Sequence, residues 1–157
     1  MKLKTTLLVS LLALSGAAFA QTAAPAAPAP DYTLSFNVGA VTDYRYRGIS
    51  QTRKKPALQG GIDFAHSSGF YLGTWASTIK WIKDGGGNAS AEIDLYGGYK
   101  GTAGAFGYDV GVLTYQYPDH SLAISPNTTE IYGAGTYGPV TLKYSHATTN
   151  LFGFANS

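Results

Sequence analysis

The chain has 157 residues, with no cysteine, 20 glycines and 12 tyrosines, and its 11 basic and 9 acidic residues give a formal net charge of +2. Two of the basic residues, Lys2 and Lys4, fall in a predicted leader, so the remainder has 9 basic (11 − 2) and 9 acidic residues. This balance gives no support to a nucleic-acid-binding role. Beyond the leader, no stretch approaches twenty consecutive apolar residues, which excludes a helical membrane protein.

The first twenty residues have the features of a cleaved export signal. Lys2 and Lys4 supply a positive start, residues 7–14 are apolar, and Ala18-Phe19-Ala20 offers the small-x-small pattern that signal peptidase needs. The next ten residues are an Ala/Pro segment that can bury nothing. We therefore predict three parts: a signal peptide over 1–20, a linker over 21–30 and a folded domain over 31–157.

From residue 31 onward, apolar and polar residues alternate with a period of two, which predicts β-strands. In one example, Val140, Leu142 and Tyr144 share a face opposite Thr141 and Lys143. Both faces of the third strand carry large side chains, so its orientation stays open, and no segment reads as a helix. The strands are expected at 34–46, 58–66, 70–81, 92–100, 106–117, 129–137 and 140–146.

The connections between these strands alternate in length. Long loops are expected at 48–57, 83–90 and 118–127, with short turns between them near residues 67–69, 101–105 and 138–139. Outer-membrane barrels have long outward loops and short periplasmic turns. The pattern predicts an all-β, antiparallel up-and-down transmembrane β-barrel. Aromatic residues near strand ends are expected to form its interfacial girdles: Tyr44, Tyr46, Phe70, Tyr71, Trp81, Phe106, Tyr115, Tyr117 and Tyr137.

About seven strands would not complete such a barrel. Bacterial single-chain barrels use an even number of strands, and residues 148–157 read as the start of a fourth long loop. We therefore expect an incomplete barrel in a chain that stops before the last strands. The structure is expected to show an open, curled sheet or a parallel closure between the first and seventh strands.

Several motifs resemble a known family. They are DYRYRGISQ at 43–51, PALQGG at 56–61, SGFYLGTW at 68–75 and EIDLYGGYKG at 92–101. The resemblance is to the TorF-type porins, a family of proteobacterial outer-membrane proteins, and it covers nearly all of 33–147. It implies an outer-membrane location and a β-barrel with further strands beyond this segment.

Charged residues on the polar faces of the strands are candidates for the lining of the barrel. Arg45 and Arg47 share a face with Asp43 and would attract anions into the lumen. The alternative is that these arginines pair with Asp63, Glu92 or Asp94 and fill the interior. The complete set of candidate lumen charges is Asp43, Arg45, Arg47, Asp63, Glu92, Asp94, Lys100 and Lys143.

A second group of charges lies in the first long loop. Arg53, Lys54 and Lys55 form a basic patch. Such a patch could clamp the phosphates of lipopolysaccharide. The expected partners are therefore outer-membrane lipid and lipopolysaccharide, together with the barrel assembly machinery during biogenesis.

Catalytic, cofactor and metal motifs are weak. The GAGTYG run at 133–138 matches a dinucleotide fingerprint, but Pro139 and a strand follow it where a helix is required. The three histidines, His66, His120 and His146, have no metal-ligand spacing. We expect no enzyme, no cofactor and no metal site.

The leading functional prediction is a porin-like channel for passive diffusion of small polar solutes. A closed structural or adhesive barrel is the alternative, because a barrel of eight strands fills with side chains whereas larger ones leave a channel. A lipid-modifying barrel enzyme and a soluble binding barrel are the remaining possibilities.

Overall fold

The computed structural model describes residues 30–154, so the predicted signal peptide and nearly all of the linker lie outside the described residues. One antiparallel sheet dominates these residues, as the sequence predicts. Each of its strands pairs with the next long strand along the chain. In that order they are β1 (Tyr32–Val41), β4 (Ala57–His66), β5 (Phe70–Thr78), β6 (Ala91–Ala103), β7 (Phe106–Gln116), β8 (Thr128–Tyr137) and β9 (Val140–Ala147).

Three small elements lie in the connections, and the sequence predicted none of them. The first strand was expected to reach residue 46, but β1 ends at Val41, and β2 (Arg45–Tyr46) and β3 (Ile49–Ser50) form a separate hairpin. The third strand was expected to reach residue 81, but a short helix, α1 (Trp81–Asp84), follows β5. The backbone N–H groups of residues 80 and 81 donate to the Gln51 carbonyl at 2.7 and 3.2 Å, which draws this segment out of the sheet.

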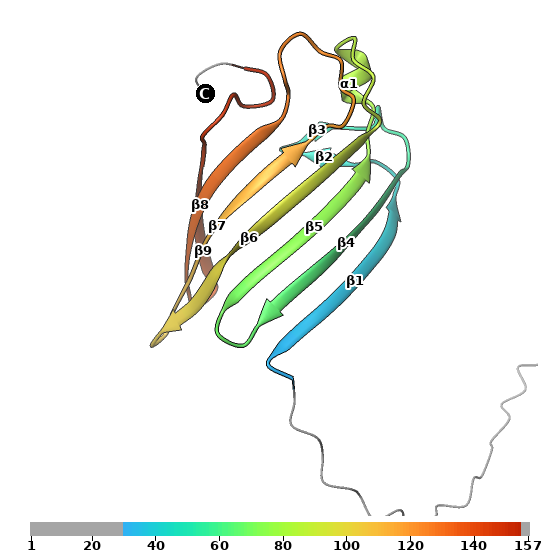
Figure 1. Ribbon diagram of the computed structural model, residues 1–157. Coiled ribbons are helices and arrows are strands. Elements are labelled where there is room, and N and C mark those ends of the chain that lie inside the picture. Colours follow the sequence, from blue (N-terminus) through green and yellow to red (C-terminus); the bar gives the residue numbers. More distant parts are fainter. Residues whose placement is uncertain (1–29, 155–157) are drawn as a thin grey trace, which may run out of the picture.

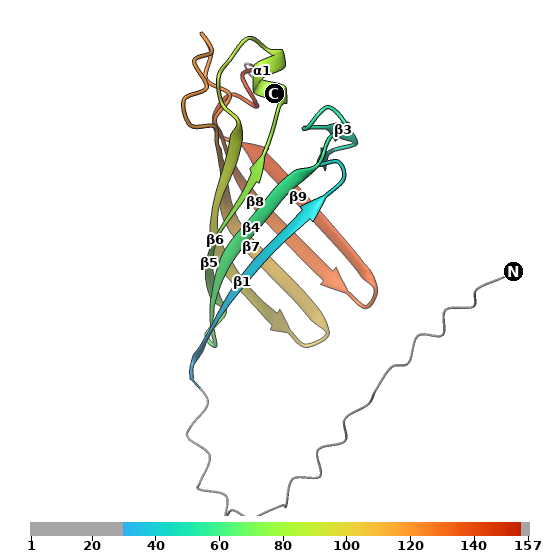
Figure 2. The same ribbon diagram turned by 90° about the vertical axis from the view of Figure 1, so that its right-hand side faces the viewer.

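The sheet is open and curled. β1 and β9 form its two edges and do not pair with each other. Figure 2 shows the curl, with β8 and β9 facing β1 and β4 across the hollow side. The expected open, curled sheet is therefore confirmed. The alternative, a parallel pairing of the first and last long strands, does not form.

The predicted alternation of connection lengths is also present. Residues 67–69, 104–105 and 138–139 make short turns, whereas residues 42–56, 79–90 and 117–127 make long connections. The long connections gather at one end of the sheet and the short turns at the other (Figure 1). We call these the loop end and the turn end. Within residues 30–154, no helix has the length and apolar character needed to cross a membrane.

The register assigns each side chain to one of two faces, because directly paired residues share a face. One row of paired residues runs from Ser35 through Asp63, Gly73 and Tyr96 to Glu130 on consecutive strands, with Leu113 between the last two. This is the concave face. The Tyr71 hydroxyl on β5 donates to Asp109 Oδ1 on β7 at 2.6 Å, so the sheet curls toward this side.

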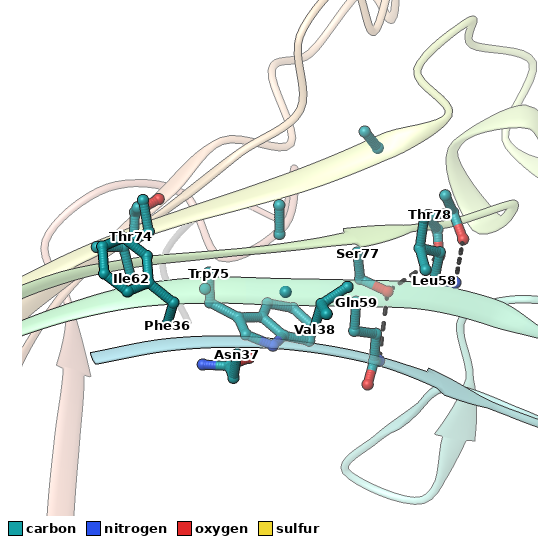
Figure 3. A pocket seen from close by; sticks show the side chains of 14 residues that line it. Phe36, Asn37, Val38, Leu58, Gln59, Ile62, Thr74, Trp75, Ser77 and Thr78 are labelled. Carbon is teal, nitrogen blue, oxygen red and sulfur yellow. Dashed lines mark hydrogen bonds between the residues drawn. The ribbon is translucent and has the colours of Figure 1, made fainter.

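The opposite, convex face is apolar and exposed. Val38 is 80% exposed and Leu142 77% exposed. A shallow groove with a cavity volume of about 550 Å³ runs over β1, β4 and β5 between Phe36, Val38 and Leu58 (Figure 3). A water-soluble protein rarely exposes an apolar surface that spans a whole sheet. The convex face therefore carries an unusually large exposed apolar surface.

Pairs of glycine and tyrosine shape the concave face. A tyrosine ring lies across the glycine directly opposite it on the neighbouring strand. A Cβ atom added at Gly111 would lie 2.6 Å from the hydroxyl oxygen of Tyr132, so a side chain there would displace the ring. The pairs are Gly73 with Tyr96, Gly98 with Tyr71 and Gly111 with Tyr132.

Candidate functional site

The most distinctive feature of the concave face is the hairpin β2–β3, which crosses it at the loop end. The hairpin lies between β1 and β4 in the sequence. The side chains of this segment nevertheless reach the more distant strands β6, β7 and β8. The Tyr44 ring also packs edge-on against Trp75 of β5, with centroids 5.4 Å apart. Three polar contacts fix the segment: Tyr44 Oη to Glu92 Oε1 at 2.6 Å, Tyr46 Oη to Tyr115 Oη at 3.0 Å, and Arg47 Nη2 to Glu130 Oε1 at 3.3 Å.

Asp43 explains why the chain turns inward after β1. Its Oδ1 accepts hydrogen bonds from the Ser50 hydroxyl at 2.5 Å and the Thr52 hydroxyl at 3.1 Å, which ties the two ends of the hairpin together. These donors, the Ser50 hydroxyl first, and the Arg45 guanidinium lower the pKa of the Asp43 carboxyl from its usual value. The backbone N–H of Gln51 also donates to the Tyr44 carbonyl at 2.7 Å and closes the base of the hairpin.

A compact hydrophobic cluster supports the hairpin from the loop end. Ile79 and Ile82 are buried there together with Tyr115 and Tyr117. Trp81 meets Tyr117 edge-on, with centroids 5.1 Å apart. Burial raises the pKa of the Tyr117 hydroxyl, and the nearby Glu92 carboxylate raises it further. The loops at this end are therefore a packed cap.

Below the cap, the concave face carries carboxylates that accept hydrogen bonds from tyrosines. Tyr96 donates to Asp63 across a neighbouring strand, and Tyr71 hydrogen bonds to both Asp109 and Tyr132. A cavity of about 440 Å³ opens beside them. Its lining consists of Tyr44, Trp75, Asp94, Tyr96, Leu113, Tyr132 and Lys143.

The predicted lumen charges divide into two groups. The register places the following five on the concave face: Asp63, Glu92, Asp94, Lys100 and Lys143. The prediction that Asp43, Arg45 and Arg47 belong to the first strand was wrong, because β1 ends at Val41. Arg45 Nε contacts Asp43 Oδ2 at 2.8 Å, and Arg47 reaches the concave face only through Glu130. Neither arginine forms the expected ion pair with Asp63, Glu92 or Asp94.

The predicted basic patch lies in the turn before β4. Arg53 Nε donates to Asp84 Oδ1 at 2.6 Å, and this contact raises the pKa of the guanidinium. Lys54 and Lys55 are exposed and form no ion pair with any described residue. Only these two charges of the patch stay available to an anionic partner.

Sequence reasoning missed two carboxylates and misplaced most of the expected girdle aromatics. Asp109 and Glu130 lie on the concave face of β7 and β8, in segments where the alternation is irregular. Tyr71 and Tyr115 also face the concave side, and Tyr44, Tyr46, Trp81 and Tyr117 pack in the cap. Of the expected aromatics, three lie on the convex face at the turn end: Phe70, Phe106 and Tyr137.

Comparisons with known proteins identify a family and no function. A family described as a bacterial protein of unknown function, Gcw_chp, matches residues 24–157. No curated protein and no solved structure matches the chain. The description links the family to no porin, so the resemblance to TorF-type proteins stays a prediction. Among residues 30–154, no group of three or more acidic or histidine side chains is placed to hold a metal ion.

Proposed function

The chain belongs to the Gcw_chp family of bacterial proteins, and we propose that its sheet forms part of the wall of an outer-membrane β-barrel. In this proposal the barrel is a channel for passive diffusion of small polar solutes. The convex face meets lipid, the concave face lines the lumen, and the hairpin β2–β3 narrows the lumen at its outer end.

The separation of charge between the two faces carries the proposal. Every charged residue of the long strands lies on the concave face, and the convex face has none of them. A lysine or arginine on the lipid face costs about 2–4 kcal/mol at the middle of a bilayer. The complete set is Asp63, Glu92, Asp94, Lys100, Asp109, Glu130 and Lys143.

Aromatic rings at the turn end of the convex face support the same reading. Phe70 and Tyr99 pack with centroids 4.9 Å apart, and Tyr99 and Tyr108 lie 6.1 Å apart. Farther along the sheet, Tyr32 stacks on Phe64 at 5.7 Å. Aromatic rings gather at this height in outer-membrane barrels because their amphipathic character suits the membrane interface. These rings would mark the periplasmic interface.

The length of the strands and the two unpaired sheet edges also agree with part of a membrane-spanning barrel. β7 has 11 residues and β8 has 10, and about 9–11 residues cross a bilayer at the usual tilt. The edges β1 and β9 would expose backbone groups to hydrocarbon, at a cost of several kcal/mol for each unsatisfied group. The proposed barrel therefore needs further strands that pair with β1 and β9.

The remaining parts of the proposal concern biogenesis and partners. The signal peptide over 1–20 would export the chain, and the barrel assembly machinery would insert it. Lys54 and Lys55, at the loop end, would meet the phosphates of lipopolysaccharide. The proposal includes no enzymatic activity.

Single-channel recording of the complete barrel, including the further strands that pair with β1 and β9, in a planar bilayer tests the function. We expect stepwise currents in KCl, because the concave face is polar and opens into a cavity of about 440 Å³. An absence of steps at every voltage, from protein that is inserted and folded, would favour the closed structural barrel and refute the channel.

A further inference from the structure

We infer that the lumen wall prefers cations over anions, an inference that rests on the proposed channel. The strands of the wall contribute the five carboxylates and two lysines named above to the concave face. The expectation of an anion-attracting lumen depended on arginines of the first loop. The contacts of the acidic and basic groups favour the opposite selectivity.

The three arginines of the first loop and hairpin are all engaged in ion pairs. Arg45 pairs with Asp43, and Arg53 pairs with Asp84 within the loops. Arg47 pairs with Glu130, and this is the only ion pair among the described residues that reaches a carboxylate of the wall. The arginines therefore leave the other carboxylates of the wall uncompensated.

Neutral donors hold most of those carboxylates in place. Glu92 accepts hydrogen bonds from the hydroxyls of Tyr44 and Tyr117, each at 2.6 Å. Asp63 and Asp109 accept from Tyr96 and Tyr71 in the same way. A tyrosine hydroxyl orients a carboxylate without cancelling its charge. The wall thus presents fixed negative charge.

The two lysines of the wall form no ion pair with a described carboxylate. Lys143 Nζ lies 3.9 Å from the centroid of the Tyr132 ring, and Lys100 Nζ lies 5.6 Å from the Tyr71 ring. Asp94 Oδ1 is buried and has no hydrogen-bond partner among the described residues, and Asp94 lines the 440 Å³ cavity. Because burial favours the neutral form of such a carboxyl group, Asp94 is left out of the count, and the three remaining carboxylates outside the Arg47 pair still outnumber the two lysines.

An excess of negative charge on the wall controls which ions enter a narrow passage. Charge of one sign in a passage with low-dielectric walls concentrates ions of the opposite sign, and rings of carboxylates give channels their cation selectivity. Asp63 lies on β4 and Asp109 lies on β7. The negative electrostatic potential of the carboxylates is therefore not confined to one strand of the wall.

Reversal potentials across a KCl gradient test the inference on the complete barrel in a planar bilayer. We expect potassium to be several-fold more permeant than chloride. The double substitution Asp63→Asn, Asp109→Asn keeps a hydrogen-bond acceptor for each tyrosine. It should bring the ratio of potassium to chloride permeability close to one, while the channel still conducts. Asp119→Asn is the matched control, because Asp119 is exposed in an outward loop at φ 56°, where asparagine is also tolerated.

Salt dependence provides a measurement that needs no variant. The preference of the unmodified channel should weaken from about 0.1 M to about 1 M KCl, because the screening length falls from roughly 10 Å to roughly 3 Å. Current without preference, or with preference for chloride, would overturn the inference and leave the channel standing. A double variant with unchanged selectivity would overturn the assignment to these carboxylates. No current from any variant would refute the channel itself and the inference with it.

Discussion

Arginine in place of Phe36 is expected to destabilise the inserted protein by about 2–4 kcal/mol, the cost of a cation on the lipid face of a barrel. Phe36 lies in the middle of β1 on the convex face and is 68% exposed. In water, a substitution at such an exposed site changes stability by only about 0.5 kcal/mol in either direction. The size of the effect therefore reports the medium that this face contacts.

The neighbouring residue supplies the control. Ser35 lies at nearly the same height on the same strand and points to the concave face, where it pairs with Asp63. Ser35→Arg is expected to destabilise the protein less than Phe36→Arg, because the arginine would then contact water and the Asp63 carboxylate. Urea titration of both variants in lipid vesicles, beside Phe36→Leu, measures the difference. Equal, small effects at both positions would contradict a lipid-facing convex surface.

Removal of the hairpin is expected to enlarge the current. The Tyr44 carbonyl and the Gln51 N–H already hydrogen bond at 2.7 Å, so an Asn-Gly pair, which suits a two-residue turn, can replace residues 45–50. The variant loses the contacts of Tyr46 and Arg47 with the far strands. Single-channel conductance should rise roughly twofold or more, because the narrowest part of a lumen limits the flow of ions.

A milder change at the hairpin separates obstruction from a general disturbance. Ile49 is 69% exposed, and its replacement in Ile49→Thr keeps the β2–β3 pairing and the contacts of Tyr46 and Arg47. Its conductance should match that of the unmodified protein. If the shortened variant also conducts like the unmodified protein, the hairpin does not restrict the lumen.

The strands were predictable because their signal is local. A period of two follows from the geometry of a single strand, and six of the seven predicted segments end within three residues of the observed strands. The long-short rhythm of connections is equally local. The third strand, whose orientation was ambiguous, proves to place Tyr71 and Trp75 on the concave face and Leu72 on the convex face.

The site was not predictable to the same extent, because its contacts are distant in sequence. Tyr44 and Glu92 are 48 residues apart, and Arg47 and Glu130 are 83 residues apart. In the sequence, the alternation of the first strand continues through Arg45 and Arg47. The hydrogen bonds from Ser50 and Thr52 to Asp43 help to turn the chain inward, and these side chains carry no periodic signal.

Accessibility of the two ends of the sheet tests the central claim most directly, namely that this sheet spans the outer membrane with its loop end outside. The chain has no cysteine, so the single substitutions Asp84→Cys in α1 and Ser67→Cys in the β4–β5 turn each give one reactive thiol. Whole cells are treated with a membrane-impermeant maleimide. We predict that Asp84→Cys is labelled on intact cells and that Ser67→Cys is labelled only after the outer membrane is permeabilised. Equal labelling of both positions, or the reverse pattern, would contradict the account.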